Sequence, residues 1–307
     1  MLFVLLVYSA SLTAQVMPID TIQHTLDKLK TELNTNYFIY NPKYKTPGVA
    51  LTSITLYEYN ADNKLTVEKS IAENDNYSVN FYKDGNVVKS VSTLLGHKKL
   101  VLKKYDKDNR LEEKKEYSDY FPDHEDKEIY TSENVKSNSK DVVTTKVYVN
   151  GNLTGTYVYK YSKEKLIERD VYRSTIVRPD SKCTYTYTAD KKHVEKEVCI
   201  DHVYKYDKEI TDTYNKQDLL EKSVETNAAK TKNKKTLYSY NEKNLLIKQE
   251  EFESDSLSIV RNTAYDANDH RLSEKAYDHK GEMIYQCLYE YDDKGNKTAY
   301  LYFYRGR

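Results

Sequence analysis

The residues best placed to do chemistry in this sequence are its tyrosines, of which there are 32 among 307 residues. Many recur as Tyr-x-Tyr, which puts both rings on one face of a β-strand because strand side chains alternate with a period of two. Such rings can pack as cross-strand pairs, or they can stay exposed to stack on sugars or to anchor another protein. Tyr300, Tyr302 and Tyr304 are the candidate surface-binding residues, because the last strand is expected to lack a neighbour that covers it.

Two of the three cysteines are spaced for a disulfide bond. Cys183 and Cys199 flank a segment that reads as strand, turn and strand, so a turn centred on Lys191 would place them opposite each other. An exported protein permits a disulfide there if the geometry allows it, and two separate free thiols are the alternative. Cys287 has no obvious partner, and we expect a small buried side chain rather than a nucleophile.

No catalytic constellation is evident in the sequence. It contains no Gly-x-Ser-x-Gly, His-Glu-x-x-His, phosphate-binding glycine-rich loop or Cys-x-x-Cys. The seven histidines are scattered over the chain, and the Asp-rich turns do not match a calcium-binding loop. We therefore expect no catalytic residues, no cofactor and no metal site, and a protein that is not an enzyme.

The composition narrows the class of partner. Lys and Arg total 48 and so do Asp and Glu, which leaves a formal net charge of zero. The sequence therefore has no excess of positive charge that would attract nucleic acid or an anionic membrane. Hydrophobic residues, tyrosine included, make up 38% of the chain, below the usual apolar share. A core is therefore expected to consist largely of tyrosine.

The chain divides into three segments. Residues 1–14 form a short apolar run that ends on small residues, as a secretory signal does, although the charged start of such a signal is missing and leaves a start further upstream open. A buried N-terminal strand is the alternative. In residues 15–48, the apolar spacing from Ile19 to Leu33 predicts a short helix packed on the first repeat, followed by a turn-rich linker. Residues 49–307 form the tyrosine-rich repeat domain.

The repeat domain has a regular period. Successive units are 25 to 27 residues apart when they are aligned on Tyr161, Tyr187, Tyr214, Tyr240, Tyr265 and Tyr291. Within a unit, Tyr-x-Tyr is followed by Asp or Asn, then by Gly or Asn, and then by an aliphatic residue, which is the order expected of a β-hairpin. About twenty strands exceed what an open twisted sheet usually holds, about ten.

We therefore predict an all-β fold in which tandem hairpins form an extended twisted antiparallel sheet or a β-solenoid. The polar stretch from Phe121 to Asp141 is predicted to be a long loop or a degenerate unit.

Two short motifs resemble known families. Tyr-x-Tyr-Asp-x-x-Gly-Asn, nearly intact at Tyr289–Asn296, resembles the YD repeat of the bacterial RHS family. Phe81-Tyr-Lys-Asp-Gly-Asn-Val87 and Val147-Tyr-Val-Asn-Gly-Asn-Leu153 resemble the MORN-like units of the YwqK antitoxin family. The resemblance covers roughly residues 50 to 307 and implies an extended, tyrosine-lined β-repeat scaffold. Such scaffolds encapsulate toxins, bind carbohydrate or contact partner proteins.

The function expected from these observations is that of an exported, non-enzymatic interaction scaffold, located in the periplasm, on the cell surface or outside the cell. The expected partner is another envelope or extracellular protein. The alternative is a carbohydrate-binding module that uses exposed tyrosine stacks to hold a polysaccharide. Nucleic acid and a transmembrane segment are not expected, and lysine and glutamate on both faces of many strands argue against a lipid-facing barrel.

Overall fold

The structure is a computed structural model that describes residues 50–72, 76–94, 96–119, 121–135, 141–173, 179–227 and 233–305. The described residues form twenty β-strands. The strands are β1 (Ala50–Tyr59), β2 (Leu65–Ala72), β3 (Asn76–Lys83), β4 (Asn86–Leu94), β5 (His97–Tyr105), β6 (Leu111–Ser118), β7 (Phe121–Val135), β8 (Val142–Val149), β9 (Asn152–Ser162), β10 (Lys165–Tyr172), β11 (Ser181–Tyr187), β12 (Val194–Asp201), β13 (Tyr206–Tyr214), β14 (Leu220–Asn227), β15 (Asn233–Tyr240), β16 (Leu246–Glu253), β17 (Ser256–Tyr265), β18 (Arg271–Asp278), β19 (Met283–Tyr291) and β20 (Lys297–Tyr304).

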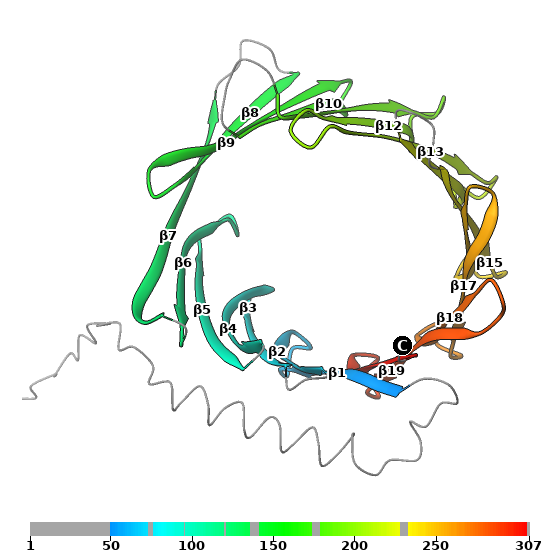
Figure 1. Cartoon of the computed structure of the whole chain (residues 1–307), viewed down its shortest axis with the longest axis horizontal. Helices are drawn as coiled ribbons and strands as arrows, with labels where there is room; N and C mark the ends of the chain where they lie inside the picture. Colours follow the sequence, from blue (N-terminus) through cyan, green and yellow to red (C-terminus); the bar gives the residue numbers. More distant parts are fainter. Residues whose placement is uncertain are drawn as a thin grey trace, which may run out of the picture.

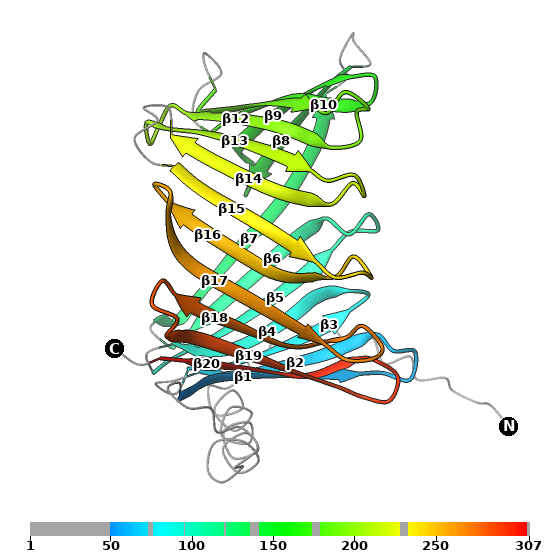
Figure 2. The same ribbon diagram turned by 90° about the vertical axis from the view of Figure 1, so that its right-hand side faces the viewer.

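The sheet closes on itself. Each strand pairs antiparallel with the next, and β1 also pairs antiparallel with β20, with Ile54 opposite Leu301 and Thr55 opposite Tyr300. The all-β class and the tandem hairpins are confirmed, but the predicted open sheet or solenoid is wrong, because the molecule is a closed 20-stranded barrel. Figure 1 shows the ring, with the first strand beside the last hairpin, and Figure 2 shows the inclined strands from the side.

Closure leaves no unpaired edge in the sheet, which removes the aggregation hazard that an edge strand presents. It also sets the size of the ring. Twenty strands about 4.8 Å apart and tilted by about 40° give a backbone ring about 40 Å across. Barrels of 16 to 18 strands already leave an aqueous channel, so the inward side chains of these strands cannot fill a ring of this width.

Several of the turns that follow a strand-ending tyrosine share one geometry. In the β1–β2 turn, the Asn60 side-chain oxygen accepts hydrogen bonds from the backbone N–H groups of Asp62 (3.0 Å) and Lys64 (2.9 Å). Asn63 then adopts a left-handed φ of 58°, which Asn tolerates better than most residues. The same pair of bonds recurs at Asp106, Asn215, Asn241, Asp266 and Asp292.

In six hairpins, the tyrosine that ends the first strand links that hairpin to the preceding one. The Tyr240 hydroxyl donates to the Leu220 carbonyl at 2.8 Å, and the Tyr265 hydroxyl donates to the Leu246 carbonyl at 2.9 Å. At the seam, the Tyr59 hydroxyl donates to the Lys297 carbonyl at 3.0 Å, so the repeating contact also spans the closure. We call these bonds the tyrosine clips; the donors are Tyr59, Tyr105, Tyr187, Tyr214, Tyr240 and Tyr265.

The two faces of the sheet differ in composition. One face carries most of the repeated tyrosines and is called the tyrosine face; it includes Tyr185, Tyr238, Tyr285, Tyr289 and Tyr300. The main aliphatic cluster lies on the opposite face, over β20 and β1 to β5. Its members are Ile54, Ile71, Tyr77, Val79, Val91, Leu100, Ala299, Leu301 and Phe303, each at most 5% exposed.

Several expectations need correction or fall outside the described residues. Of the two alternatives predicted for Phe121–Asp141, the long loop is wrong over most of its length, because Phe121–Val135 is strand β7 and pairs with β6 and β8. A degenerate repeat unit is the alternative that remains. The predicted signal segment, residues 1–14, and the helix and linker of residues 15–48 lie outside the described residues. In the part of the chain that the structure describes, no helix is long and apolar enough to cross a membrane.

Candidate functional site

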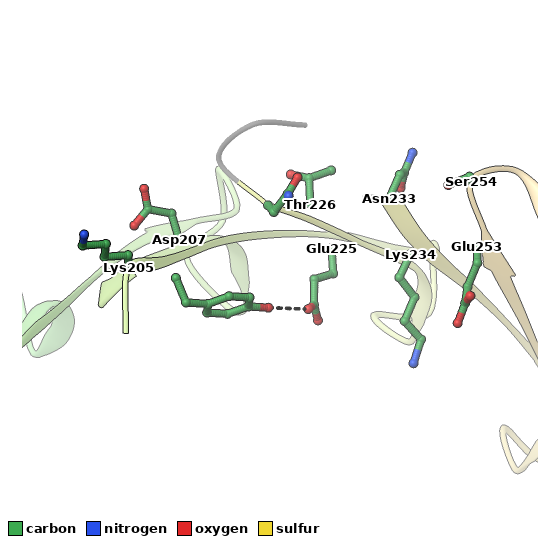
Figure 3. A pocket seen from close by; sticks show the side chains of 10 residues that line it. Lys205, Asp207, Glu225, Thr226, Asn233, Lys234, Glu253 and Ser254 are labelled. Carbon is green, nitrogen blue, oxygen red and sulfur yellow. Dashed lines mark hydrogen bonds between the residues drawn. The ribbon is translucent and has the colours of Figure 1, made fainter. Parts of the chain in front are cut away.

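The tyrosine face lines the inside of the ring. A closed sheet is concave on its inner face, and the strand residues that line surface hollows of the described residues belong mainly to the tyrosine face. In Figure 3, Glu225, Lys234 and Glu253 point to one side of the strands, while Thr226 and Asn233 point to the other. The tyrosine-face residues that line hollows are Tyr206, Glu225 and Lys234 in one, Tyr130, Ser132 and Val147 in a second, and Tyr238 and Tyr240 in a third.

The densest group of rings on this face lies on β19 and β20. Tyr289 and Tyr300 stand opposite each other with ring centroids 5.3 Å apart, and Tyr285 and Tyr302 lie 5.6 Å apart. Tyr302 also stacks on Tyr304 at 6.4 Å, with an angle of 18° between the ring planes. Aromatic pairs at these separations contribute about 0.5–1.5 kcal/mol beyond the area that they bury. The five rings form two adjacent aromatic groups, Tyr289 with Tyr300 and Tyr285 with Tyr302 and Tyr304, on two neighbouring strands.

A charged network borders these rings on β16, β17 and β18. Arg261 Nε donates to the Tyr285 hydroxyl at 2.8 Å, and its Nη1 pairs with Glu251. The Tyr285 hydroxyl in turn donates to Glu274 Oε1 at 2.7 Å. Arg271 lies 5.7 Å from the Tyr289 ring centroid and pairs with Glu274 at 3.4 Å. We call the five rings and these charged residues the aromatic wall.

The environment fixes the protonation states in the wall. Burial and the hydrogen bond to Glu274 raise the pKa of Tyr285 far above its ordinary value. Burial and the contact with Cys287 do the same for the pKa of Tyr300. Burial would also raise the pKa of Glu251, but Arg261 and Lys234 hold it below its ordinary value. At neutral pH the Tyr285 and Tyr300 phenols are therefore neutral, and Glu251 is ionised beside Arg261.

The wall continues across the seam of the barrel. The Lys297 ammonium lies 4.2 Å from the centroid of the Tyr57 ring, and burial lowers the pKa of Lys297 despite the nearby Glu68 carboxylate. On the other side of Glu68, Asn80 donates to its carboxylate at 3.0 Å and the Tyr82 hydroxyl donates at 3.4 Å. Aromatic and charged groups are thus found on the tyrosine face of every strand from β16 through the seam to β3.

The three tyrosines predicted for surface binding belong to the wall, but the reason given for choosing them is wrong. Strand β20 is covered on both sides, by β19 and by β1, so it is not an uncovered terminal strand. Tyr300 and Tyr302 are half-buried, and Tyr304 is 37% exposed. Sequence reasoning missed four wall residues, namely Glu251, Arg261, Arg271 and Glu274. The signal that could have found them was the alternation of side chains between the two faces of a strand, which places each of them on the tyrosine face.

The cysteines occupy the same face. Cys183 and Cys199 stand opposite each other on β11 and β12, and a disulfide bond joins them. Glu197 lies close enough to form a three-residue group with them, but disulfide sulfurs are not thiolates and do not bind metal as thiolates do. Cys287 is buried, its sulfur lies 3.2 Å from the Tyr300 hydroxyl, and burial raises the pKa of its thiol.

Both faces of the sheet carry ion pairs in the middle of strands. On the opposite face, Glu168 bridges Lys160 and Lys182, while on the tyrosine face Glu251 pairs with Arg261. The opposite face therefore carries charged groups as well as the aliphatic cluster.

Comparison with known proteins gives no family for the chain. No protein-family model matches it, and no curated protein matches it in sequence. The resemblance to the RHS and YwqK families, which rests on short motifs, has no support at that level.

Among solved structures, a chain of the Photorhabdus luminescens Tc holotoxin pore is 12% identical over 88% of this chain, with a TM-score of 0.38. A chain of the TcdB2-TccC3-TEV structure is 13% identical, also over 88%, with a TM-score of 0.36. The present chain spans 12% and 13% of the length of those two chains. A porin-like protein from Bacteroides uniformis is 10% identical over 84% of this chain and 97% of its own, with a TM-score of 0.36. These likenesses are weak, and no function is concluded from them.

Proposed function

We propose that this protein is an exported, non-enzymatic scaffold that binds another protein of the bacterial envelope or extracellular space on the inner, tyrosine-lined face of its barrel. The aromatic wall carries the proposal. Tyrosine and arginine are the residue types enriched at protein interfaces and among their energetic hot spots. Five tyrosines and two arginines meet on four neighbouring strands, β17 to β20, where cross-strand contacts hold their side chains in place.

The dimensions of the ring support the same proposal. A ring about 40 Å across leaves space that its own inward side chains do not fill, so a segment of a second protein can reach the wall. Preorganised rings lose little conformational entropy when a partner binds, which favours affinity. The short apolar start supports export, and the disulfide bond between Cys183 and Cys199 suits an oxidising compartment.

The test is an affinity pull-down from the native cell envelope, with the chain lacking residues 1–14 as bait. Two double variants add the same charges to opposite faces. Thr263→Lys with Ser132→Lys alters the tyrosine face; Asn262→Lys with Thr131→Lys alters the adjacent positions of the opposite face. All four side chains are polar; three lie at the surface and Thr263 is half-buried. Because lysine at a half-buried position can affect folding, circular dichroism and thermal unfolding serve as folding controls.

The proposal expects one stoichiometric partner with the wild type and with the opposite-face variant, and loss of that partner with the tyrosine-face variant. Loss with the opposite-face variant alone would show that the binding surface is wrongly placed. Recovery of no partner by the wild type would overturn the scaffold proposal itself.

A further inference from the structure

A second feature lies outside the aromatic wall, at the rim of the barrel where β13 begins and β14 ends. A hollow of about 690 Å³ opens there between the ends of four strands. Ligand-binding pockets are commonly 300–1,000 Å³ in volume, so the hollow has room for a ligand of small-oligosaccharide size. It is lined by Lys205, Tyr206, Asp207, Glu225, Thr226, Asn227, Asn233, Lys234, Glu253 and Ser254 (Figure 3).

The rings next to this hollow are the most exposed tyrosine side chains of the described residues. Tyr206, in the lining, is 50% exposed, and Tyr204, on the preceding turn, is 72% exposed. The Tyr206 hydroxyl donates to Glu225 Oε1 at 3.3 Å, which orients the ring at the edge of the hollow. In contrast, the rings of the aromatic wall are half-buried except for Tyr304. Tyr206 therefore offers a flat apolar surface to solvent beside a polar cavity.

The polar groups of the lining suit a ligand rich in hydroxyl groups. Carboxylates accept hydrogen bonds from hydroxyls, amide and ammonium groups donate to them, and threonine and serine do both. Three carboxylates and two ammonium groups line the hollow, so its net charge is negative. Lys234 and Glu225 are moreover engaged by neighbours outside the lining, namely Glu251 at 3.2 Å and Lys208 at 3.1 Å. An anionic ligand is therefore disfavoured.

We infer that this rim hollow is a binding site for neutral oligosaccharides. The C–H face of a pyranose ring carries partial positive charge and packs against the electron-rich face of the Tyr206 ring. The sugar hydroxyls exchange hydrogen bonds with Glu225, Glu253 and the lining amides. The lining touches the aromatic wall through the Lys234–Glu251 ion pair but shares no residue with it, so the inference goes beyond the proposed scaffold function and does not depend on it.

The test uses the purified chain against an array of neutral malto-, cello-, xylo-, chito- and manno-oligosaccharides, with oligogalacturonate and hyaluronan fragments as acidic probes. Calorimetry then measures the affinity for each neutral probe that binds. Tyr206→Ala is expected to weaken binding by about tenfold or more, equivalent to about 1.4 kcal/mol, because the stacking face is lost. Tyr206→Phe keeps the ring and is expected to bind within about threefold of the wild type, equivalent to about 0.6 kcal/mol.

Tyr204→Ala is the matched control, because Tyr204 is an exposed ring two residues away that does not line the hollow. It is expected to leave the affinity unchanged. The inference fails if no neutral oligosaccharide binds, if the acidic probes bind more tightly, or if Tyr206→Ala and Tyr204→Ala weaken binding equally. Protein capture by the aromatic wall is expected to survive Tyr206→Ala, so failure of one proposal is distinguishable from failure of the other.

Discussion

The tyrosine clips are expected to hold neighbouring hairpins together, and removing their hydroxyl groups tests this. The perturbation is replacement of all six donor tyrosines by phenylalanine, which keeps each ring and deletes only the hydrogen bond to the preceding hairpin. The donors are Tyr59, Tyr105, Tyr187, Tyr214, Tyr240 and Tyr265, with donor–acceptor distances of 2.8 to 3.1 Å.

The expected loss follows from the burial of the clips. A protein hydrogen bond contributes about 0.5–1.5 kcal/mol net, and these bonds are partly buried, so about 0.5–1 kcal/mol each is appropriate. The clips lie on different hairpins and share no partner, so their effects are expected to add. Six replacements therefore lower the free energy of unfolding by about 3–6 kcal/mol, a large share of the 5–15 kcal/mol typical of native proteins.

Urea denaturation followed by circular dichroism measures this loss as a shift of the midpoint. Single replacements such as Tyr240→Phe give the individual contributions, and Tyr204→Phe with Tyr304→Phe is the control, because both rings are exposed. If the sixfold variant unfolds at the same urea concentration as the wild type, or loses no more than the control, the clips do not stabilise the barrel and the reasoning is wrong.

Three further predictions concern the rest of the chain. The Cys183–Cys199 bond is expected in the exported protein and to contribute about 3 kcal/mol, the entropic value for a loop of about 15 residues; free thiols at both positions after non-reducing alkylation and mass spectrometry would contradict it. Hydrogen bonds from backbone N–H groups lower the pKa of Asp106 and Asp278 in the folded state. The stabilisation that these two carboxylates provide is therefore present above the ordinary carboxyl pKa of about 3.9, and it is lost as the pH falls through the lowered folded-state pKa. Replacing both by Asn, which the β1–β2 turn already uses, is expected to make acid unfolding less steep; an unchanged acid profile would count against this account. Deleting residues 15–48 is expected to lower the melting temperature and to expose the cluster around Ile54 and Leu301 to a hydrophobic dye. An unchanged melting temperature and dye signal would contradict the prediction of a helix packed on the first repeat.

The local structure of this protein was largely readable from its sequence. Tyr-x-Tyr followed by Asn or Asp and then a residue that tolerates positive φ specifies a hairpin through interactions within a few residues. The bonds of Asn60 and the left-handed Asn63 are an instance. The same locality explains why the Cys183–Cys199 register was foreseeable from a turn centred on Lys191, which has a φ of 63°.

Closure could not be read from the same signals, because it depends on the summed tilt and register of all twenty strands. The pairing of Ile54 with Leu301 joins residues at opposite ends of the repeat domain, and no local pattern marks either as a seam residue. Strand β7 was misread for a related reason. Its polar residues carry no strand signal of their own, and β6 and β8, which pair with it on either side, supply the backbone partners.

The sequence indicated the tyrosines of the aromatic wall but not its charged residues. The tyrosines stood out by number, but Arg261 and Glu274 looked like ordinary members of a solvated face. Only the register brings Arg261, Tyr285 and Glu274 together from three strands into one hydrogen-bonded chain.

The central claim is that the sheet is closed and so has an inner face, and amide hydrogen exchange at the seam tests it most directly. The account predicts that amides bonded across β1 and β20, around Ile54 and Leu301, exchange as slowly as those across β15 and β16, around Leu237 and Glu250. Fast exchange confined to β1 and β20, with slow exchange elsewhere, would show two free edges and contradict the closed barrel on which the proposed function rests.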